Sequence, residues 1–110
     1  KDITDIEVQP TPVDTKPNHW LTAITVKADS KVKPLDIMEA LEKENIESRR
    51  IWKPMNLQPV YKDNMFYNHN ENGISVGEDI FNRGVCLPSD TKMTNDDLKR
   101  VINIITSLFN

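Results

Sequence analysis

Glycine, cysteine and long apolar runs are all scarce in this 110-residue chain. Its three glycines leave few backbone positions that adopt a positive φ at low cost, and they form no glycine-rich phosphate-binding loop. Cys86 is the single cysteine. No disulfide forms within the chain, and we expect a cytoplasmic protein. No apolar run approaches the roughly 18 residues of a membrane span, and we expect neither a signal peptide nor a membrane partner.

An excess of positive charge is also lacking. Fourteen basic and 17 acidic residues give a net charge of −3. Domains that bind nucleic acids usually carry a basic stripe, so we expect no nucleic-acid partner. The densest basic patch consists of Arg49, Arg50 and Lys53, which suits a small anionic molecule better than a duplex backbone. The length and the balance of apolar and charged residues are typical of one globular domain.

What the chain does contain is an alternation of strand and helix patterns. Its prolines predict that residues 1–17 form an extended linker, which could pair only as a short edge strand. The expected elements after it begin with an inner strand at His19–Lys27, a helix at Pro34–Asn45 and a short strand at Ser48–Trp52. The irregular stretch over 57–72 is expected to be a mobile loop or a short helix, with a turn at Asn72-Gly73. It is followed by a short helix ended by Gly84, a buried strand at Val85–Pro88 and a helix capped by Thr94 with an apolar face from Leu98 to Phe109. This order predicts an α/β protein, specifically an α+β two-layer sandwich with helices on one face of a small sheet.

The usual catalytic and metal-binding motifs are absent. There is no G-x-G-x-x-G, no phosphate-loop motif and no H-E-x-x-H. His19 and His69 are half the chain apart and lack the paired spacing of zinc ligands, so we expect no metal site. Cys86 lies in the apolar run "VCLP", where a buried core residue is a better interpretation than a catalytic thiolate.

The stretch "SRRIWKPMNLQPVY", residues 48–61, differs from ordinary core sequence. Arg49 can make a planar two-pronged contact with a phosphate or carboxylate, and Lys53 supplies a point charge. Trp52 can stack, and Asn56 offers both a donor and an acceptor. An equally simple interpretation is a surface crossing with Trp52 in the core and both arginines solvated. The pattern alone leaves both interpretations open.

Three ordered blocks carry a family resemblance: "NHWLTAITV", "ESRRIWKPMNLQPVY" and "GEDIFNRGVCLPSDTKMTNDDLKRVINII". They resemble the C-terminal end of the pyridoxal-phosphate-dependent nucleotide-sugar aminotransferases, the DegT/DnrJ/EryC1/StrS family. The middle block is similar to that family's SR-x-x-W-K-P-M-H-x-Q-P segment, and the similarity covers residues 18–108. Within the family, the branch that acts on UDP-linked 4-keto-6-deoxy-hexoses is the most similar.

The resemblance implies that residues 18–110 form the small C-terminal domain of an aspartate-aminotransferase type I fold. A large N-terminal domain would precede it and carry the lysine that forms the Schiff base with pyridoxal phosphate. The working unit would be a homodimer that transfers an amino group, usually from glutamate, to a nucleotide-linked keto sugar. This chain alone is then expected to bind no cofactor and to be inactive.

The matched blocks also nominate site residues. Arg49, Trp52, Lys53 and Asn56 fall in the block that would face the substrate, where Arg49 or Lys53 would hold a diphosphate or carboxylate. Trp20 lies in another matched block and would be either a core residue or part of the pocket wall. Asn56 stands where the family motif usually has histidine, and asparagine does not titrate near neutral pH. The substrate preference therefore stays open at this position.

A rival hypothesis is a free-standing small α/β module that binds an anionic metabolite. A third is an interaction domain that docks through its last helix. The chain begins at Lys1 rather than methionine, and its first segment is rich in proline; both features favour a piece cut at a domain junction. Such a piece should expose apolar surface that once met its large domain or its dimer partner.

Overall fold

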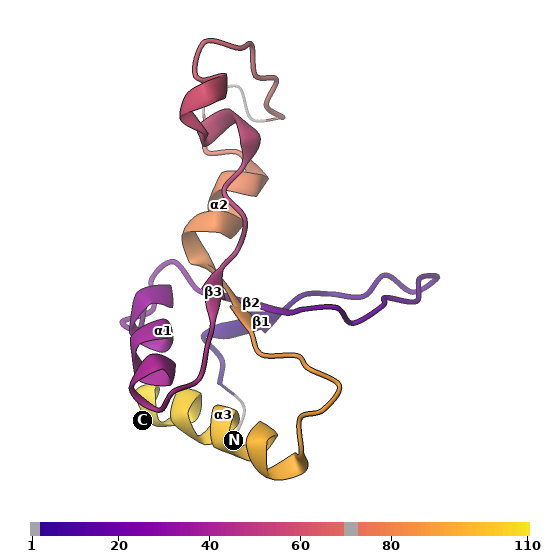
Figure 1. Cartoon of the computed structure of the whole chain (residues 1–110). Helices are drawn as coiled ribbons and strands as arrows, with labels where there is room; N and C mark the ends of the chain where they lie inside the picture. Colours follow the sequence, from indigo (N-terminus) through magenta and orange to yellow (C-terminus); the bar gives the residue numbers. More distant parts are fainter. Residues whose placement is uncertain (1–2, 70–72) are drawn as a thin grey trace.

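The computed structural model describes residues 3–69 and 73–110, and a four-stranded sheet lies at its centre (Figure 1). Each described strand pairs antiparallel with its neighbour, in the spatial order β1-β2-β4-β3. The strands are β1 (Ile6–Val8), β2 (Thr22–Val26), β3 (Arg49–Arg50) and β4 (Gly84–Leu87). β2 is an inner strand, as its apolar residues on both faces predict. Helices and an antiparallel sheet together confirm the predicted α/β class.

Two helices cover one face of this sheet. They are α1 (Pro34–Lys43) and α3 (Asn95–Leu108). Ile24 and Val26 alternate along β2 and therefore point to the same face. There they meet residues of both helices and of β4 in one buried cluster, whose other members are Ile37, Leu41, Val85, Val101 and Ile105. None of the helices in the described part of the chain has the length and apolar character needed to cross a bilayer.

The predicted cap of α3 is confirmed. The hydroxyl of Thr94 accepts a hydrogen bond from the Asp97 backbone N–H at 3.2 Å, and the Asp97 carboxylate accepts one from the Thr94 N–H at 2.9 Å. This reciprocal pair satisfies two backbone donors that a helix start leaves open. Arg100 of α3 donates a hydrogen bond to the carbonyl of Glu44, the residue that follows α1. This bond joins the two helices.

The buried stripe of α3 is narrower than its sequence predicts. Val101 and Ile105 are buried, whereas Leu98 and Ile102 are exposed. α1 and the sheet cover only the side of α3 that faces them. Leu108 and Phe109, at the end of the face, are partly buried against the core.

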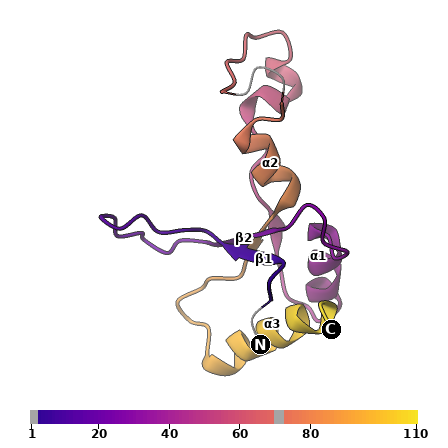
Figure 2. The same ribbon diagram turned by 180° about the vertical axis from the view of Figure 1, so that it is seen from behind.

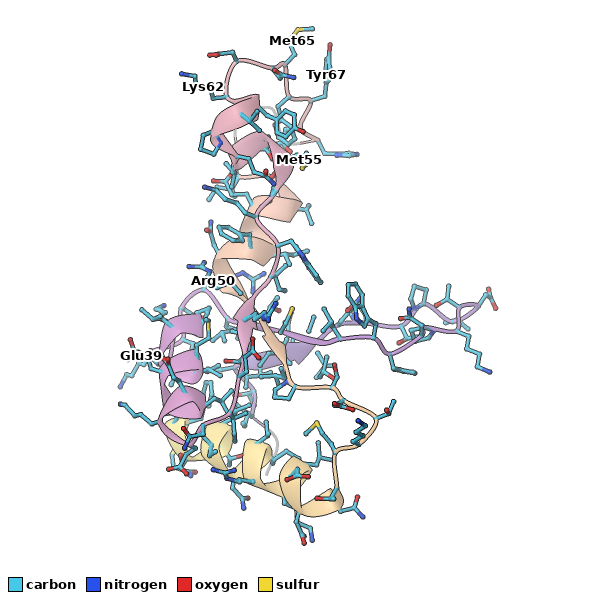
Figure 3. All side chains as sticks on the ribbon, viewed as in Figure 1. Glu39, Arg50, Met55, Lys62, Met65 and Tyr67 are labelled. Atoms are coloured by element: carbon cyan, nitrogen blue, oxygen red, sulfur yellow. The ribbon has the colours of Figure 1, made fainter. Side chains whose placement is uncertain are left out.

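Residues 51–69 and 73–83 rise from the sheet as a projection that we call the tower (Figures 1 and 2). It contains the 3₁₀-helices η1 (Met55–Leu57) and η2 (Pro59–Tyr61) and the helix α2 (Val76–Arg83). Met65 and Tyr67 stand exposed at its tip (Figure 3), where residues 62–69 and 73–75 form no helix. The turn predicted at Asn72-Gly73 includes Asn72, which lies outside the described residues.

A second projection, the arm, comprises residues 9–21 between β1 and β2 (Figures 1 and 2). Every residue from 7 to 20 is exposed. The segment predicted as a linker contributes β1, whose Ile6 pairs with Val26. The strand expected from His19 begins only at Thr22, because His19 takes a left-handed φ of 52° and bends the chain there.

Gly84 ends α2 as predicted, but for a different reason. Its φ of −99° is open to any residue, so no left-handed cap is involved. A Cβ at this position would lie 2.3 Å from Cδ1 of Ile51 and 2.5 Å from the carbonyl oxygen of Ile80. Glycine is needed because two chain segments approach closely where the tower rejoins the sheet. Ile51 has left the sheet by this point, so β3 is shorter than the predicted Ser48–Trp52.

Candidate substrate-facing hollow

A hollow of about 430 Å³ lies where the arm, β3 and the end of β4 meet. We call it the indole hollow; it is lined by residues 20–21, 47–50, 52 and 86–90. Strand register explains part of this grouping, because Ala23, Cys86 and Arg49 are successive partners across β2, β4 and β3. Directly paired residues share a face of a sheet. Arg49 therefore lies on the face opposite the one that α1 and α3 cover.

The two tryptophans of the chain meet at this hollow. The ring centroids of Trp20 and Trp52 are 5.6 Å apart, and the planes are tilted by 36°. Trp20 is 68% exposed and Trp52 63% exposed despite this contact. The interpretation of Trp52 as a core residue is therefore wrong. Two large aromatic side chains from distant parts of the sequence form a joint apolar surface open to solvent.

The charged groups of the indole hollow largely compensate each other. Nε and Nη2 of Arg49 both donate to Oε1 of Glu47, at 2.8 and 2.6 Å. Arg50 donates to the carbonyl of Phe81 at 3.0 Å and lies 4.6 Å above the Phe81 ring centroid, at the base of the tower (Figure 3). Asp90 adds a second carboxylate to the lining. Two arginines against two carboxylates leave the hollow without a formal net charge.

Cys86 lies in the wall of the indole hollow but is buried. Burial raises the pKa of its thiol above the ordinary value, because the thiolate would lose solvation. The side chain therefore stays a neutral thiol at neutral pH and is a poor nucleophile. This confirms the interpretation of Cys86 as a core residue.

Three of the five predicted site residues come together in this hollow, and two do not. Arg49, Trp52 and Trp20 line it, whereas Lys53 and Asn56 lie further along the chain, within the tower. The carbonyl of Lys53 accepts a hydrogen bond from the Gln58 side chain at 3.3 Å, which holds the tower's first turn.

The indole hollow also contains residues that the sequence reasoning did not nominate. Glu47 lies two positions before Arg49. Residues two apart on an extended segment point to the same side, and this spacing could have identified Glu47. Ser89 and Asp90 follow β4 and carry no local signal, because only the folded arm brings Trp20 beside them.

A second hollow, of about 470 Å³, lies between the β1–β2 edge and α2. Arg83 spans it: Nη1 donates to the carbonyl of Val26 at 3.0 Å, while Nε and Nη2 donate to the Asp79 carboxylate at 2.8 and 2.5 Å. The hydrogen bonds from Arg83 lower the pKa of Asp79 and outweigh desolvation, which acts in the opposite direction. These contacts fix the tower to the sheet.

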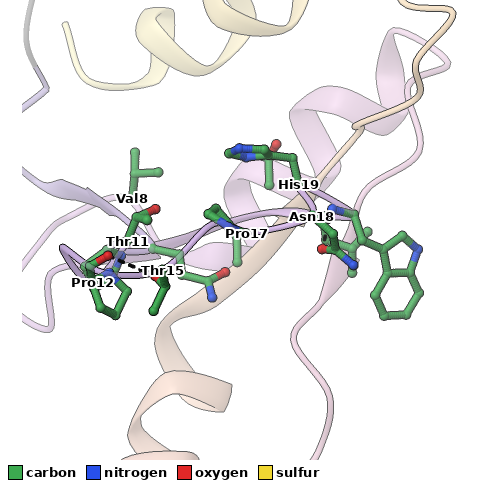
Figure 4. A pocket seen from close by; sticks show the side chains of 13 residues that line it. Val8, Thr11, Pro12, Thr15, Pro17, Asn18 and His19 are labelled. Carbon is green, nitrogen blue, oxygen red and sulfur yellow. Dashed lines mark hydrogen bonds between the residues drawn. The ribbon is translucent and has the colours of Figure 1, made fainter.

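A third hollow, of about 510 Å³, lies between the two sides of the arm (Figure 4). Thr15 donates its hydroxyl to the carbonyl of Pro12 at 2.9 Å and closes the arm's tip. Its lining offers a single titratable side chain, His19, and therefore no catalytic pair. Among the described residues, no group of three or more histidines, cysteines, aspartates or glutamates is placed to hold a metal ion.

The indole hollow by itself does not fit pyridoxal phosphate, the cofactor that the resemblance implies. No lysine is among the described residues that line it. The hollow therefore lacks a covalent anchor for the cofactor, although the exposed guanidinium of Arg49 can be reached by an anionic group.

Comparisons with known proteins place the chain in a family. Residues 1–106 match the model of the DegT/DnrJ/EryC1/StrS aminotransferase family. The Bacillus subtilis (strain 168) protein named "Putative pyridoxal phosphate-dependent aminotransferase EpsN" is 47% identical over 92 residues, which are 84% of this chain and 23% of that protein. GDP-perosamine synthase of Vibrio cholerae is 28% identical over 93 residues, 84% of this chain and 24% of that enzyme.

The fold is shared with a solved enzyme of the same family. A crystal structure of a DegT DnrJ EryC1 StrS aminotransferase from Brucella abortus matches with a TM-score of 0.76 and 21% identity, over 96% of this chain and 26% of the other. The chain spans about a quarter of the length of these relatives. By its sequence match over residues 1–106 and its identity to a curated relative, this chain belongs to the DegT/DnrJ/EryC1/StrS aminotransferase family.

Proposed function

We propose that this chain is the small C-terminal domain of a longer pyridoxal-phosphate-dependent aminotransferase that acts on a nucleotide-linked keto sugar. The observation that carries the proposal is 47% identity to an aminotransferase relative of which the chain spans only 23%. In this proposal residues 1–17 lead in from the missing large domain, and residues 18–110 form the small domain. The GDP-perosamine synthase among the relatives supports a nucleotide-linked sugar as the substrate.

The whole enzyme would be a cytoplasmic homodimer, with glutamate as the usual amino donor. Pyridoxal phosphate, held by the large domain, would supply the electron sink for amino transfer. The small domain alone would be inactive. Its own contribution is to bind and orient the sugar nucleotide. Arg49, Trp20 and Trp52 form the wall of the indole hollow, and Lys53 and Asn56 extend this wall along the first part of the tower.

Arg49 is the residue of this wall best suited to an anionic group of the substrate. Its side chain is 78% exposed, and among the described residues its guanidinium is held by Glu47, 74% exposed, through a surface ion pair. Exposed pairs of this kind contribute little stability, so a diphosphate or carboxylate can replace Glu47 at low cost. Lys53 is exposed as well, and its ammonium is free to move on a flexible stem.

Alanine substitution of Arg49 and Lys53 in the longer enzyme tests this role. Removing a charge-assisted hydrogen bond should raise the KM for one of the two substrates by about tenfold. Steady-state kinetics with both substrates gives the measurement. Lys62→Ala, an exposed change near the tower tip (Figure 3), is the matched control and should leave KM unchanged. Unchanged KM values for both substrates in the Arg49 and Lys53 variants would remove the proposed role.

A further inference from the structure

The tryptophan pair is the strongest binding feature of the indole hollow. Trp20 and Trp52 leave about two thirds of their surface exposed although they touch each other. An aromatic ring inserted between them would need centroids about 7 Å apart, twice the roughly 3.5 Å of a stacking contact. The observed 5.6 Å is too short. A flat ligand must therefore lie on an outer face of the pair.

Trp20 is held in position by contacts on both sides of its backbone. Its backbone N–H donates a hydrogen bond to Oδ1 of Asn18 at 3.1 Å, and its backbone carbonyl accepts one from the hydroxyl of Ser89 at 2.8 Å. The preceding His19 takes a left-handed φ of 52°, which is uncommon for a residue with a side chain. Three constraints thus fix the backbone that carries an exposed indole, and this indole adds nothing to the core. A binding surface held in this way loses little conformational entropy when a ligand arrives.

The charges around the pair decide which part of a ligand it favours. Arg49 is paired with Glu47, Arg50 is held on Phe81, and Asp90 is a second carboxylate in the lining. Because the formal charges cancel, the hollow has no strong attraction for a bare anion. The exposed indoles remain as the main source of affinity, and indole faces bind flat, weakly polar rings by stacking.

We propose that Trp20 and Trp52 form a nucleobase subsite, on which the base of the sugar nucleotide stacks while its diphosphate reaches Arg49. This inference rests on the proposed function for the identity of the ligand as a nucleotide. It goes further by assigning the base, rather than the sugar or the phosphates, to the indole pair. Stacking reads the flat face that every base shares, so the subsite provides affinity with little preference among bases.

Tryptophan fluorescence tests the subsite directly, because Trp20 and Trp52 are the only two tryptophans in the chain. We would titrate the 110-residue chain with uridine, uridine diphosphate and inorganic pyrophosphate, exciting where the base does not absorb. Uridine and uridine diphosphate should quench the emission, with the diphosphate binding more tightly. Pyrophosphate should leave the emission unchanged. Quenching by pyrophosphate equal to that by the nucleotide would overturn the proposal, as would no quenching by either nucleoside compound.

Variants then separate stacking from other causes of quenching. Trp52→Ala should weaken uridine diphosphate binding at least about fivefold, followed through the remaining Trp20, whereas Trp52→Phe should retain part of the affinity. Tyr67→Ala, an exposed aromatic at the tower tip, should have no effect. Equal affinity in the wild-type chain and Trp52→Ala, both with native circular dichroism, would show that the base does not stack there. Displacement of the nucleotide by a simple methyl glycoside would likewise assign the surface to a sugar ring and contradict the proposal.

These titrations need no cofactor and no turnover. A failure of the subsite therefore leaves the aminotransferase assignment untouched. Conversely, a colourless native protein of 110 residues would contradict the aminotransferase proposal even if nucleosides bound to the tryptophans.

Discussion

At the residue scale, part of the lining of the indole hollow follows from the sequence, and part of it exists only in the folded chain. Arg49, Trp52 and Trp20 were nominated from residue type and from the family blocks, and the fold brings them together. The ion pair between Glu47 and Arg49 was not foreseen, although their two-residue spacing on an extended segment indicated it. Ser89 could not have been nominated, because its contact with Trp20 joins positions 69 residues apart and exists only in the folded chain.

At the residue scale, the ion pair predicts competition between Glu47 and anionic ligands. Glu47→Gln removes the carboxylate that must leave Arg49 when a diphosphate binds. Because exposed ion pairs contribute up to about 1 kcal/mol, affinity for uridine diphosphate should rise by up to about fivefold. Calorimetric titration of the wild-type chain and the variant measures the change. Glu39→Gln, an exposed carboxylate on α1 (Figure 3), is the control. Weaker binding by Glu47→Gln would show that the carboxylate contacts the ligand itself.

At the scale of secondary-structure elements, the sequence patterns predicted correctly which helices and strands form. They predicted the lengths of these elements less well. The inner position of β2, the helix at Pro34 and the capped α3 all follow from local sequence. β3 was predicted longer than its two residues, because the close approach of Ile51 to Gly84 belongs to the packing of the tower base. The edge strand β1 was expected only as an option, since pairing of a proline-rich segment depends on a partner edge elsewhere in the chain.

Gly84, at the start of β4, and Gly77, within α2, give a matched test of that packing. Gly84→Ala places a methyl group against a backbone oxygen that cannot move easily. It should destabilise the fold by about 1–3 kcal/mol. Gly77→Ala meets only Pro54 Cγ, at 3.6 Å, inside α2. It should be neutral or stabilising by about 0.5–1 kcal/mol. Chemical denaturation measures both, and equal effects of the two substitutions would contradict the tight approach at Gly84.

The attachment of the tower also predicts a dependence on pH. Arg83 lowers the pKa of Asp79 below its ordinary value in the folded state. The stabilisation is therefore present above the unfolded pKa, about 3.9, and is lost as pH falls through the lower folded value. Both side chains remain partly exposed, so solvent limits the pair to about 1 kcal/mol.

Asp79→Asn isolates this contribution. The variant should be less stable than the wild-type chain at pH 7, and the difference should shrink below about pH 4. Urea denaturation across this range gives the free energies of unfolding. Asp96→Asn, which alters a highly exposed pair with Lys99 on α3, serves as the comparison. A stability difference for Asp79→Asn that did not change with pH would show that the pair is not the cause.

At the scale of the whole molecule, the arm and the tower set the shape. The Cα radius of gyration is 15.8 Å, against about 13 Å for a compact domain of this length. Both projections carry exposed apolar side chains, among them Val13, Trp20, Trp52, Met65 and Tyr67. Exposed apolar surface of this kind is found at ligand-binding sites as well as at contacts between proteins. It is also what we expect of a small domain that is separated from its large domain.

The central claim is that this chain is the small domain of a longer aminotransferase. The most direct measurement is the mass and the visible absorption spectrum of the native gene product, purified from its source cells. The account predicts a protein about four times longer than this chain, consistent with the share of its relatives that the chain spans, and yellow from bound pyridoxal phosphate. A colourless protein of 110 residues would contradict the account and favour a free-standing module that binds an anionic metabolite.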